Sequence, residues 1–396
     1  MAKLRVGFHS PYFGSTLGGG ERYLCVTACT VRDRFPDAAV EIVSPVLADR
    51  ALNERRLGVD LSGIELVATN RRVTPAHRFL NSVAALRPLR NRVLARQAAR
   101  FTDRYDVFLP MAYAIRVPPR RGPGAILCQF PYQDPGPELE GYQLVVCYSE
   151  YVRRWVGAYW DRDAAVVNPP VEVPGAEPDW DRKDRVILSV GRFFRGGHSK
   201  RQDLLVRAFR DLAGAGLEGW ELHLAGSVHR PAGHAGFYEE VAAAARGLPI
   251  FLHPDAPADE LEGLFARASI YWHAAGFGDA SDPASAEHFG MTTVEAMARG
   301  AVPVVFGRGG QLEVVRDGAE GFLWTDTEQL ARRTRQLATD GELRSRMGRA
   351  ARSASLRFGR PRFEAEMARV LEPVLERAAR EADHVPLPRP SGGTSP

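Results

Sequence analysis

The sequence has few cysteines, few lysines and no long hydrophobic run. Four cysteines occur among its 396 residues, and none of them forms a C-x-x-C pair. A disulfide framework is therefore excluded, and we expect reduced, buried thiols. No apolar stretch approaches the roughly 18 residues that a membrane-spanning helix needs, and no signal-peptide core follows Met1. These absences predict a cytoplasmic protein.

Lysine is rare, but the total charge is nearly balanced. The chain has 52 basic and 48 acidic residues, and only three of the basic residues are lysines, so a lysine within a motif is informative. Hydrophobic residues make up 45% and charged residues 25%, which excludes a disordered or fibrous chain. The length favours two or three domains over one small module.

Short apolar runs alternate with helix-length segments, a pattern typical of βα units around parallel sheets. The alternation stops at residues 168–184, where four prolines and several acids show no periodicity. We therefore predict an α/β fold with two doubly wound domains joined by this segment. Strands are expected at residues 4–9, 40–44, 64–68, 107–111, 125–130, 144–148, 165–167, 186–190, 221–225, 250–253, 270–273 and 302–306.

The C-terminal segment repeats apolar residues at helical spacing. Residues 363–381 carry a stripe that includes Met367, Leu371 and Val374, which predicts an amphipathic helix. Residues 382–396 are rich in Pro, Gly and Ser, so a disordered tail is expected there.

Three glycines stand in the segment LGGGERYL, residues 17–24, shortly after the first expected strand. Glycines between a strand and a helix allow close backbone approach, so free N–H groups can face an anion. A flexible turn before a helix is the alternative. The chain has no dinucleotide G-x-G-x-x-G here and no G-x-x-x-x-G-K-[ST], which disfavours NAD enzymes and P-loop NTPases.

Two basic residues stand near the start of the C-terminal half. The strand expected at 186–190 is followed by Arg192 and then by Lys200. Ligand sites of parallel sheets lie at the carboxyl ends of strands. An arginine fork matches phosphate oxygens and a lysine adds a point charge, so this pair could neutralise a diphosphate. Two solvated surface cations are the alternative.

The segment AEHFGMTTVEAMARGAVPV, residues 286–304, combines two acids with a helix start. A short helix is expected at about 290–300, and its first N–H groups would favour a phosphate. Glu287 precedes this helix and Glu295 lies within it. Because carboxylates repel phosphate, we expect the two acids to bind hydroxyl groups, which sugars and riboses supply.

This segment closely resembles the E-x7-E motif of retaining glycosyltransferases of family 4. These enzymes have the GT-B fold, in which two Rossmann-like domains face a central cleft and a C-terminal helix crosses back to the N-terminal domain. LGGGERYL resembles the family's Gly-Gly-x-Glu loop, and SVGRFF…SK its donor-phosphate segment. The resemblance implies an acceptor-binding domain of residues 1–172 plus 362–381 and a nucleotide-sugar-binding domain of residues 173–361.

The resemblance also implies roles for single residues. Glu295 resembles the acid that holds the nucleotide ribose, and Glu287 the acid that faces the donor sugar. Arg192 and Lys200 resemble the basic pair that stabilises the departing diphosphate, and with Glu287 they are the expected catalytic residues. The other implied donor-binding residues are Gly18, Gly19, Phe289, Gly290, Met291, Thr292 and Thr293.

The implied reaction moves a hexosyl group from GDP-mannose or a UDP-hexose to an acceptor hydroxyl, with retention of configuration. Fixed positive groups would act as negative charge grows on the leaving diphosphate. The resemblance implies no metal ion and no cofactor. Two alternatives stay open: a GT-B epimerase or phosphorylase, and a nucleotide-sugar-binding or lipid-associated protein without turnover.

The expected acceptor is a glycan, a lipid-linked saccharide or a small metabolite. Nine arginines and one acid, Asp103, occur between Arg71 and Arg104. Such a stretch could rest on anionic lipid at the inner face of the membrane. A solvated arginine-rich face is the alternative. Nucleic acid is disfavoured, because aromatic residues are scarce in this stretch and the net charge is only +4.

Overall fold

The computed structural model describes residues 3–14, 18–69, 87–112, 117–119, 122–133, 136–180, 183–228 and 236–383. The chain forms two compact units. Unit 1 comprises Met1–Val146, Tyr159–Ala165 and Glu364–Pro396, and unit 2 comprises Cys147–Ala158 and Val166–Phe363. Residues 147–158 and 166–172, which the sequence assigned to the N-terminal domain, lie in unit 2. The start of segment 147–158 is hydrogen-bonded to loops of that unit.

Unit 1 is built on a parallel sheet with the strand order β3-β2-β1-β4. Parallel bridges from Phe108 to Gly124 and from Met111 to Leu127 connect β4 to a second sheet, β5-β6-β7. The strands are β1 (Leu4–His9), β2 (Ala38–Ser44), β3 (Glu65–Ala68), β4 (Val107–Pro110), β5 (Ala125–Cys128), β6 (Leu144–Cys147) and β7 (Ala165–Val166). The helices of this half are α1 (Gly19–Arg34), α2 (Arg50–Leu57), α4 (Arg87–Thr102), η2 (Pro137–Gly141) and α5 (Glu150–Trp160).

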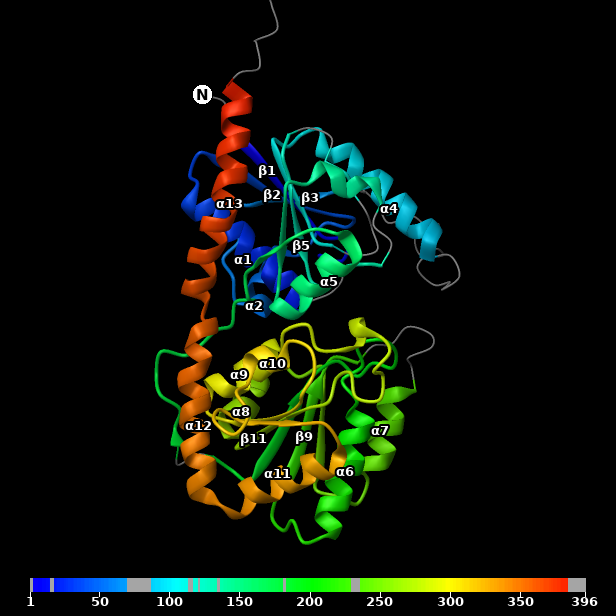
Figure 1. The fold of residues 1–396 in the computed structure, drawn as a ribbon, viewed down its shortest axis with the longest axis vertical. Helices are drawn as coiled ribbons and strands as arrows, with labels where there is room; N and C mark the ends of the chain where they lie inside the picture. Colours follow the sequence, from blue (N-terminus) through cyan, green and yellow to red (C-terminus); the bar gives the residue numbers. More distant parts are fainter. Residues whose placement is uncertain are drawn as a thin grey trace, which may run out of the picture. The chain divides into compact units, whose positions relative to one another are not determined.

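Unit 2 contains a six-stranded parallel sheet with the order β10-β9-β8-β11-β12-β13. The strands are β8 (Val186–Val190), β9 (Glu221–Gly226), β10 (Ile250–Pro254), β11 (Ile270–His273), β12 (Val302–Phe306) and β13 (Phe322–Trp324). Figure 1 shows α6 (Gln202–Gly214) and α7 (Phe237–Ala245) on one side of the sheet, and α8 (Ala258–Arg267) and α9 (Met291–Ala298) on the other. The remaining helices are η4 (Pro283–Ser285), α10 (Gln311–Val314), α11 (Thr327–Thr339), α12 (Gly341–Ser355), η5 (Leu356–Phe358) and α13 (Arg360–Asp383).

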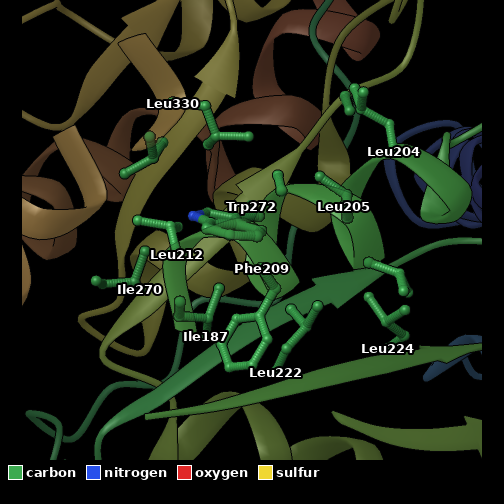
Figure 2. Packing of buried hydrophobic residues seen from close by; sticks show 14 of the residues in the cluster. Ile187, Leu204, Leu205, Phe209, Leu212, Leu222, Leu224, Ile270, Trp272 and Leu330 are labelled. Carbon is green, nitrogen blue, oxygen red and sulfur yellow. The ribbon is translucent and has the colours of Figure 1, made fainter. Parts of the chain in front are cut away.

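The core of unit 2 lies between the sheet and its helices. Figure 2 shows Trp272 of β11 surrounded by aliphatic residues of the strands and of α6. The Trp272 indole N–H donates to Thr334 Oγ1 at 3.0 Å, so the one polar atom of this buried ring is satisfied. Each fully buried side chain of this size contributes about 2 kcal/mol to folding, so the sheet edge is a rigid support for its loops.

The fold agrees with the fold class expected from the sequence. All twelve expected strands are present, and the helix expected at 290–300 is α9. The short strand β13 was missed, because three residues are too few to form a recognisable run. α13 runs to Asp383, so the expected tail at 382–396 is wrong for its first two residues, and the rest lies outside the described residues.

No helix within the described ranges combines the length and the hydrophobicity that crossing a bilayer requires.

Candidate active site

The candidate site lies where the strand order of unit 2 reverses direction. β9 and β10 follow β8 on one side, and β11 begins the series on the other side, so the loops after β8 and β11 diverge. Such a switch point leaves a crevice at the carboxyl ends of the strands, where open α/β sheets bind ligands. Lys200 follows β8 and Glu287 follows β11, which explains how residues 87 positions apart meet.

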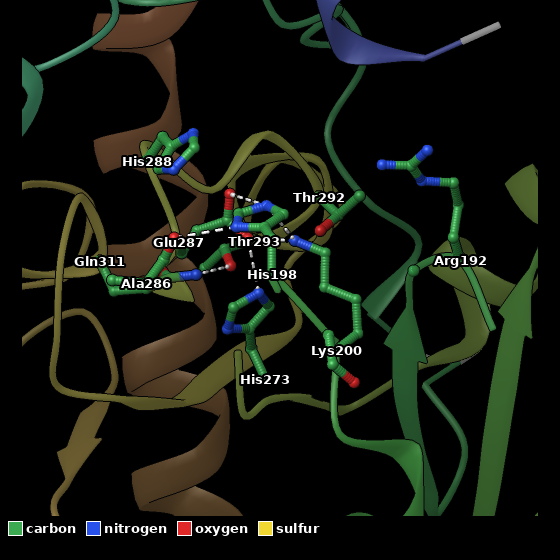
Figure 3. A network of polar contacts seen from close by, with 12 residues as sticks. Arg192, His198, Lys200, His273, Ala286, Glu287, His288, Thr292, Thr293 and Gln311 are labelled. Atoms are coloured by element: carbon green, nitrogen blue, oxygen red, sulfur yellow. Dashed lines mark hydrogen bonds and ion pairs between the residues drawn. The ribbon is translucent and has the colours of Figure 1, made fainter. Parts of the chain in front are cut away.

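Lys200 and Glu287 form a buried ion pair. Lys200 Nζ donates to Glu287 Oε2 at 2.5 Å, and the side chains are 18% and 12% exposed (Figure 3). The aliphatic part of Lys200 passes over Gly191, where a Cβ would lie 2.5 Å from Lys200 Cγ. Gly191 is therefore required for the lysine to reach the carboxylate.

Two histidines complete this group, which we call the Lys200 cluster: His198, Lys200, His273 and Glu287. His273, the last residue of β11, donates from Nε2 to Glu287 Oε2 at 2.8 Å. Lys200 Nζ lies 3.2 Å from His198 Nε2, and His198 Nδ1 lies 2.9 Å from the Ala286 carbonyl oxygen. Both hydrogen bonds of Glu287 fall on Oε2, and Oε1 lies 3.9 Å from His198 Nε2, beyond hydrogen-bond distance, so Oε1 keeps acceptor capacity for a ligand hydroxyl.

Burial and charge shift the pKa values within the Lys200 cluster. Burial alone would raise the pKa of Glu287, but the Lys200 charge and the His273 hydrogen bond outweigh it and hold that pKa well below its usual range. Burial lowers the pKa of His198 well below its ordinary value, and it also lowers the pKa of His273. At neutral pH, Glu287 is therefore a carboxylate and both histidines are neutral imidazoles.

α9 begins beside this cluster at a glycine turn. Gly290 has φ +113°, a left-handed conformation, and a Cβ there would lie 2.9 Å from Gln311 Nε2. The Gln311 amide donates to Thr293 Oγ1 at 2.9 Å, and the Tyr271 hydroxyl donates to Thr292 Oγ1 at 2.7 Å. These bonds fix the first turn, whose free N–H groups suit an anionic ligand.

The start of α5 supports the loop that carries Glu287. The Glu313 carboxylate accepts from the backbone N–H groups of Glu150 and Tyr151 at 2.9 and 2.7 Å. The Ser149 hydroxyl donates to the His288 carbonyl at 2.5 Å, and the Tyr151 hydroxyl donates to the carbonyl of Pro283 at 2.8 Å. These four bonds explain why residues 147–158 belong to unit 2.

A cavity of about 290 Å³ borders the cluster at His198. The loop after β8, the start of α6 and the loop after β11 form its wall, which includes Ser199 and Asp279. The two arginines in the wall are each paired with a carboxylate, as Arg195–Glu240 and Arg201–Asp203. The cavity therefore offers hydroxyl and carboxylate groups rather than uncompensated cations.

Of the residues predicted from the sequence, Lys200 and Glu287 are in direct contact. Arg192 is exposed just after β8, with its guanidinium carbon 5.9 Å from the Phe194 ring centroid, and Figure 3 shows it beside the cluster without a drawn contact. Glu295 is half-buried on α9.

The remaining predicted residues fall on two helix starts. In unit 2, Phe289 is buried against Phe358, Gly290 is the N-cap of α9, and residues 291–293 form its first turn. In unit 1, Gly18 is the N-cap of α1 and Gly19 its first residue.

Sequence reasoning missed several residues of the site. His198 and His273 received no role, although one stands two residues before Lys200 and the other ends an expected strand. The position at a strand end was a usable signal for His273. Tyr271 and Gln311 carried no signal, because their roles depend on contacts 21 and 18 residues away in the chain.

Within the part of the chain that the structure describes, no group of three or more His, Cys, Asp or Glu side chains is arranged to hold a metal ion.

Part of the chain matches a known protein family. Residues 176–354 match the family model described as glycosyl transferases group 1. That segment contains β8 to α12 and the whole Lys200 cluster. The structural matches show that the fold is GT-B.

Individual proteins resemble the chain at lower identity. A GDP-Man:Man(3)GlcNAc(2)-PP-Dol alpha-1,2-mannosyltransferase of Dictyostelium discoideum is 26% identical over 271 residues, which cover 60% of this chain. The match spans only 50% of the mannosyltransferase.

Two solved structures match almost the full chain. Anabaena HepE, solved in complex with UDP and glucose, has a TM-score of 0.66 at 16% identity and covers 93% of this chain and 99% of its own. Sucrose-phosphate synthase of Thermosynechococcus elongatus has a TM-score of 0.70 at 14% identity, with coverage of 94% and 99%. At these identities the matches establish the fold alone.

Proposed function

We propose that this chain is a retaining glycosyltransferase of family 4 that transfers a hexosyl group from a nucleotide sugar to an acceptor hydroxyl. The observation that carries the proposal is the buried Lys200–Glu287 pair at the switch point of unit 2, next to the start of α9. A fixed ammonium and a helix N-terminus suit a diphosphate, and a carboxylate with a spare oxygen suits a sugar hydroxyl.

The proposed chemistry is a front-face substitution. The bond between the anomeric carbon and the phosphate oxygen breaks, and its electron pair leaves with the nucleoside diphosphate. The acceptor oxygen bonds to the anomeric carbon on the same face, and its proton passes to the leaving phosphate oxygen. Lys200, Arg192 and the first turn of α9 stabilise the growing negative charge, so no metal ion is required.

The proposed donor is GDP-mannose or a UDP-hexose. Similarity to a mannosyltransferase named for GDP-Man supports the first, and similarity to a protein solved with UDP and glucose supports the second. In this proposal Glu295 binds the ribose, Glu287 binds the sugar, and Gly18 and Gly19 approach the phosphates. The acceptor is a glycan, a lipid-linked saccharide or a small metabolite.

Calorimetric titration with GDP and with UDP, without added metal, tests the donor site. One nucleotide should bind, and Glu295→Ala and Arg192→Ala should each weaken it by about tenfold or more, because each removes a charge-assisted contact. Arg210→Ala is a matched control, since Arg210 is an exposed arginine of α6 paired only loosely with Asp211 at 3.8 Å. Binding of neither nucleotide would contradict the proposal and favour a protein without turnover.

Product analysis separates transfer from the competing GT-B reactions. A phosphorylase consumes inorganic phosphate and an epimerase needs no acceptor, so both are recognised from the stoichiometry. NMR of the new glycosidic bond reports whether the donor configuration is retained. A trapped covalent glycosyl–enzyme ester would overturn the front-face mechanism.

The exposed face of α4 supports a second proposal, contact with an anionic membrane surface. Arg92, Arg96 and Arg100 are exposed and spaced four residues apart, so they share one face of the helix. Leu89 on the same helix is 51% exposed, and the helix contains no acid. Cations beside an apolar side chain suit lipid headgroups, each contributing about 1 kcal/mol at an anionic surface.

Flotation with phosphatidylcholine vesicles, with and without phosphatidylserine, tests this contact. More protein should float with the anionic vesicles, and replacing the three α4 arginines by alanine should abolish the difference. The matched control replaces three exposed arginines of α11 and α12, namely Arg332, Arg335 and Arg346. Equal recovery with both vesicles would contradict a peripheral membrane location.

A further inference from the structure

The backbone around His198 is held in an uncommon conformation. His198 has φ +64° and Arg201 has φ +56°, both in the left-handed region, and Lys200 lies between them. Such positions cost on the order of 1 kcal/mol each for a non-glycine residue and persist only where surrounding contacts require them. The contacts of the His198 ring must therefore hold this backbone conformation.

The two hydrogen bonds of the His198 ring determine its protonation, because its other contacts, the His288 ring at 4.6 Å between centroids and Glu287 Oε1 at 3.9 Å from Nε2, are not hydrogen bonds. The Ala286 carbonyl oxygen, 2.9 Å from Nδ1, can only accept, so Nδ1 must carry a hydrogen. The Lys200 ammonium, 3.2 Å from Nε2, can only donate, so Nε2 must be bare. Only the neutral tautomer with hydrogen on Nδ1 satisfies both contacts.

The same counting applies to Lys200. Its ammonium has three N–H groups, of which one is directed to Glu287 and one to His198. One N–H is left for a ligand. Without His198, the ammonium would be constrained by Glu287 alone and could rotate about that single contact.

From this geometry we infer that His198 is a positioning residue, which holds Lys200 so that its third N–H is presented to the donor diphosphate. The inference rests on the proposed function and deepens it, because it assigns the orientation of the phosphate-binding lysine to a neutral histidine acceptor. His198 itself acts only through Lys200. Its contact with the Ala286 carbonyl also links the loop after β8 to the residue that precedes Glu287.

Two substitutions of His198 test the contributions of Nδ1 and Nε2 separately. In His198→Asn the side-chain amide can still reach the Ala286 carbonyl, and asparagine tolerates the left-handed backbone, but the acceptor for Lys200 is lost. In His198→Gln the side-chain oxygen can reach the Nε2 position and accept from Lys200. kcat/KM for the nucleotide sugar should fall about tenfold in His198→Asn and less than threefold in His198→Gln.

The control for this pair is His253→Asn on β10, where the ring bonds Glu260 and is remote in sequence from the cluster. It should leave kcat/KM unchanged. Equal losses in His198→Asn and His198→Gln, at unchanged melting temperature, would mean that the ring only fills space, and the inference would be overturned.

A measurement without substrate keeps the inference independent of the proposed function. ¹⁵N NMR of the imidazole nitrogens should show His198 with hydrogen on Nδ1 and a bare Nε2. In Lys200→Met the hydrogen should stay on Nδ1, which the Ala286 carbonyl fixes, but the Nε2 resonance should shift because Nε2 loses the hydrogen bond from the ammonium. A hydrogen on Nε2 in the wild-type protein at neutral pH would overturn the inference. If the tautomer is as expected but neither GDP nor UDP binds, the holding of Lys200 stands and the glycosyltransferase proposal fails.

Discussion

The two helix starts that the sequence proposed as phosphate sites differ in how they use glycine. Gly290, at the start of α9 in unit 2, has φ +113° and leaves no room for a Cβ beside Gln311. Gly18, at the start of α1 in unit 1, is extended at φ −160°, and among the described residues the nearest atom to a Cβ there is Glu21 Oε2 at 3.5 Å. The backbone conformation requires glycine at position 290 but not at position 18, so a ligand is the reason that the proposed function gives for Gly18.

The largest effect is expected from removing the negative charge of Glu287, which precedes the start of α9 in unit 2. Glu287→Gln leaves the Lys200 ammonium without its counter-ion in a buried position. Stability should fall by about 3 kcal/mol, and transfer activity by about 100-fold or more, because the cluster no longer holds its geometry. Urea denaturation and steady-state kinetics measure the two losses.

Glu320→Gln is the matched control for this substitution. Glu320 is 3% exposed and pairs with Arg316 and Arg357 at 2.8 and 3.0 Å, outside the Lys200 cluster. The Glu320→Gln variant should lose about as much stability as Glu287→Gln but keep its transfer activity. If both variants kept activity, Glu287 would be a structural acid and the site assignment would be wrong.

Lowering the pH should reduce the stability of unit 2 more than that of unit 1. Burial lowers the pKa of His288 to about 4, and it also lowers the pKa values of His198 and His273. An unfolded histidine takes up a proton below about pH 6.5, whereas His288 stays neutral down to about pH 4. The unfolded state then binds more protons, so stability falls as pH falls through this window, by up to roughly 3 kcal/mol for His288.

Unit 1 contains a counterpart in His9, whose pKa burial also lowers to about 4. Hydrogen exchange at pH 7 and pH 5 compares the units, and amides of β11 and β12 should lose more protection than those of β1 and β2. Equal losses would contradict a greater acid sensitivity from the buried histidines of unit 2, His198, His273 and His288.

The elements of both units could be predicted because parallel strands buried on two faces read as continuous apolar runs. Val186–Val190 and Val302–Phe306 are examples that lie in the sheet as expected. β13 could not be predicted, because Phe322–Trp324 is too short to stand out from its glycine-containing turn.

The site was only partly predictable. Resemblance to a known motif pointed to Lys200 and Glu287. Their contact depends on β8 and β11 being neighbouring strands, and a local sequence pattern does not predict which strands are neighbours. The role of His198 depends on a left-handed backbone and on a carbonyl 88 residues away. Tertiary hydrogen bonds of this kind leave no periodic trace in a sequence.

A smaller effect is expected from Gly290→Ala. Alanine pays about 1–2 kcal/mol for the left-handed conformation, and the Gln311 amide must also move away from Thr293. Gly318→Ala is the matched control, because Gly318 has φ +75° and no atom within 4 Å of an added Cβ. Both variants should lose stability in urea denaturation for the left-handed conformation, and Gly290→Ala should lose more because its Gln311–Thr293 hydrogen bond is disturbed. Only Gly290→Ala should lose nucleotide binding. Equal binding in the two would mean that the first turn of α9 does not contact the nucleotide.

The smallest change in stability is expected from Gly18→Ser, and it bears most directly on the comparison. Serine is at least as good as glycine at an N-cap and adopts extended backbone freely, so the free energy of unfolding should change by less than about 0.5 kcal/mol. If the donor phosphates approach Gly18 closely, the added side chain should raise the KM for the nucleotide sugar about five-fold, equivalent to about 1 kcal/mol. Gly175→Ser serves as the control, since nothing lies within 4 Å of a Cβ at that position. An unchanged KM in Gly18→Ser would remove unit 1 from the proposed phosphate site and leave the Lys200 cluster and the α9 start to bind the diphosphate alone.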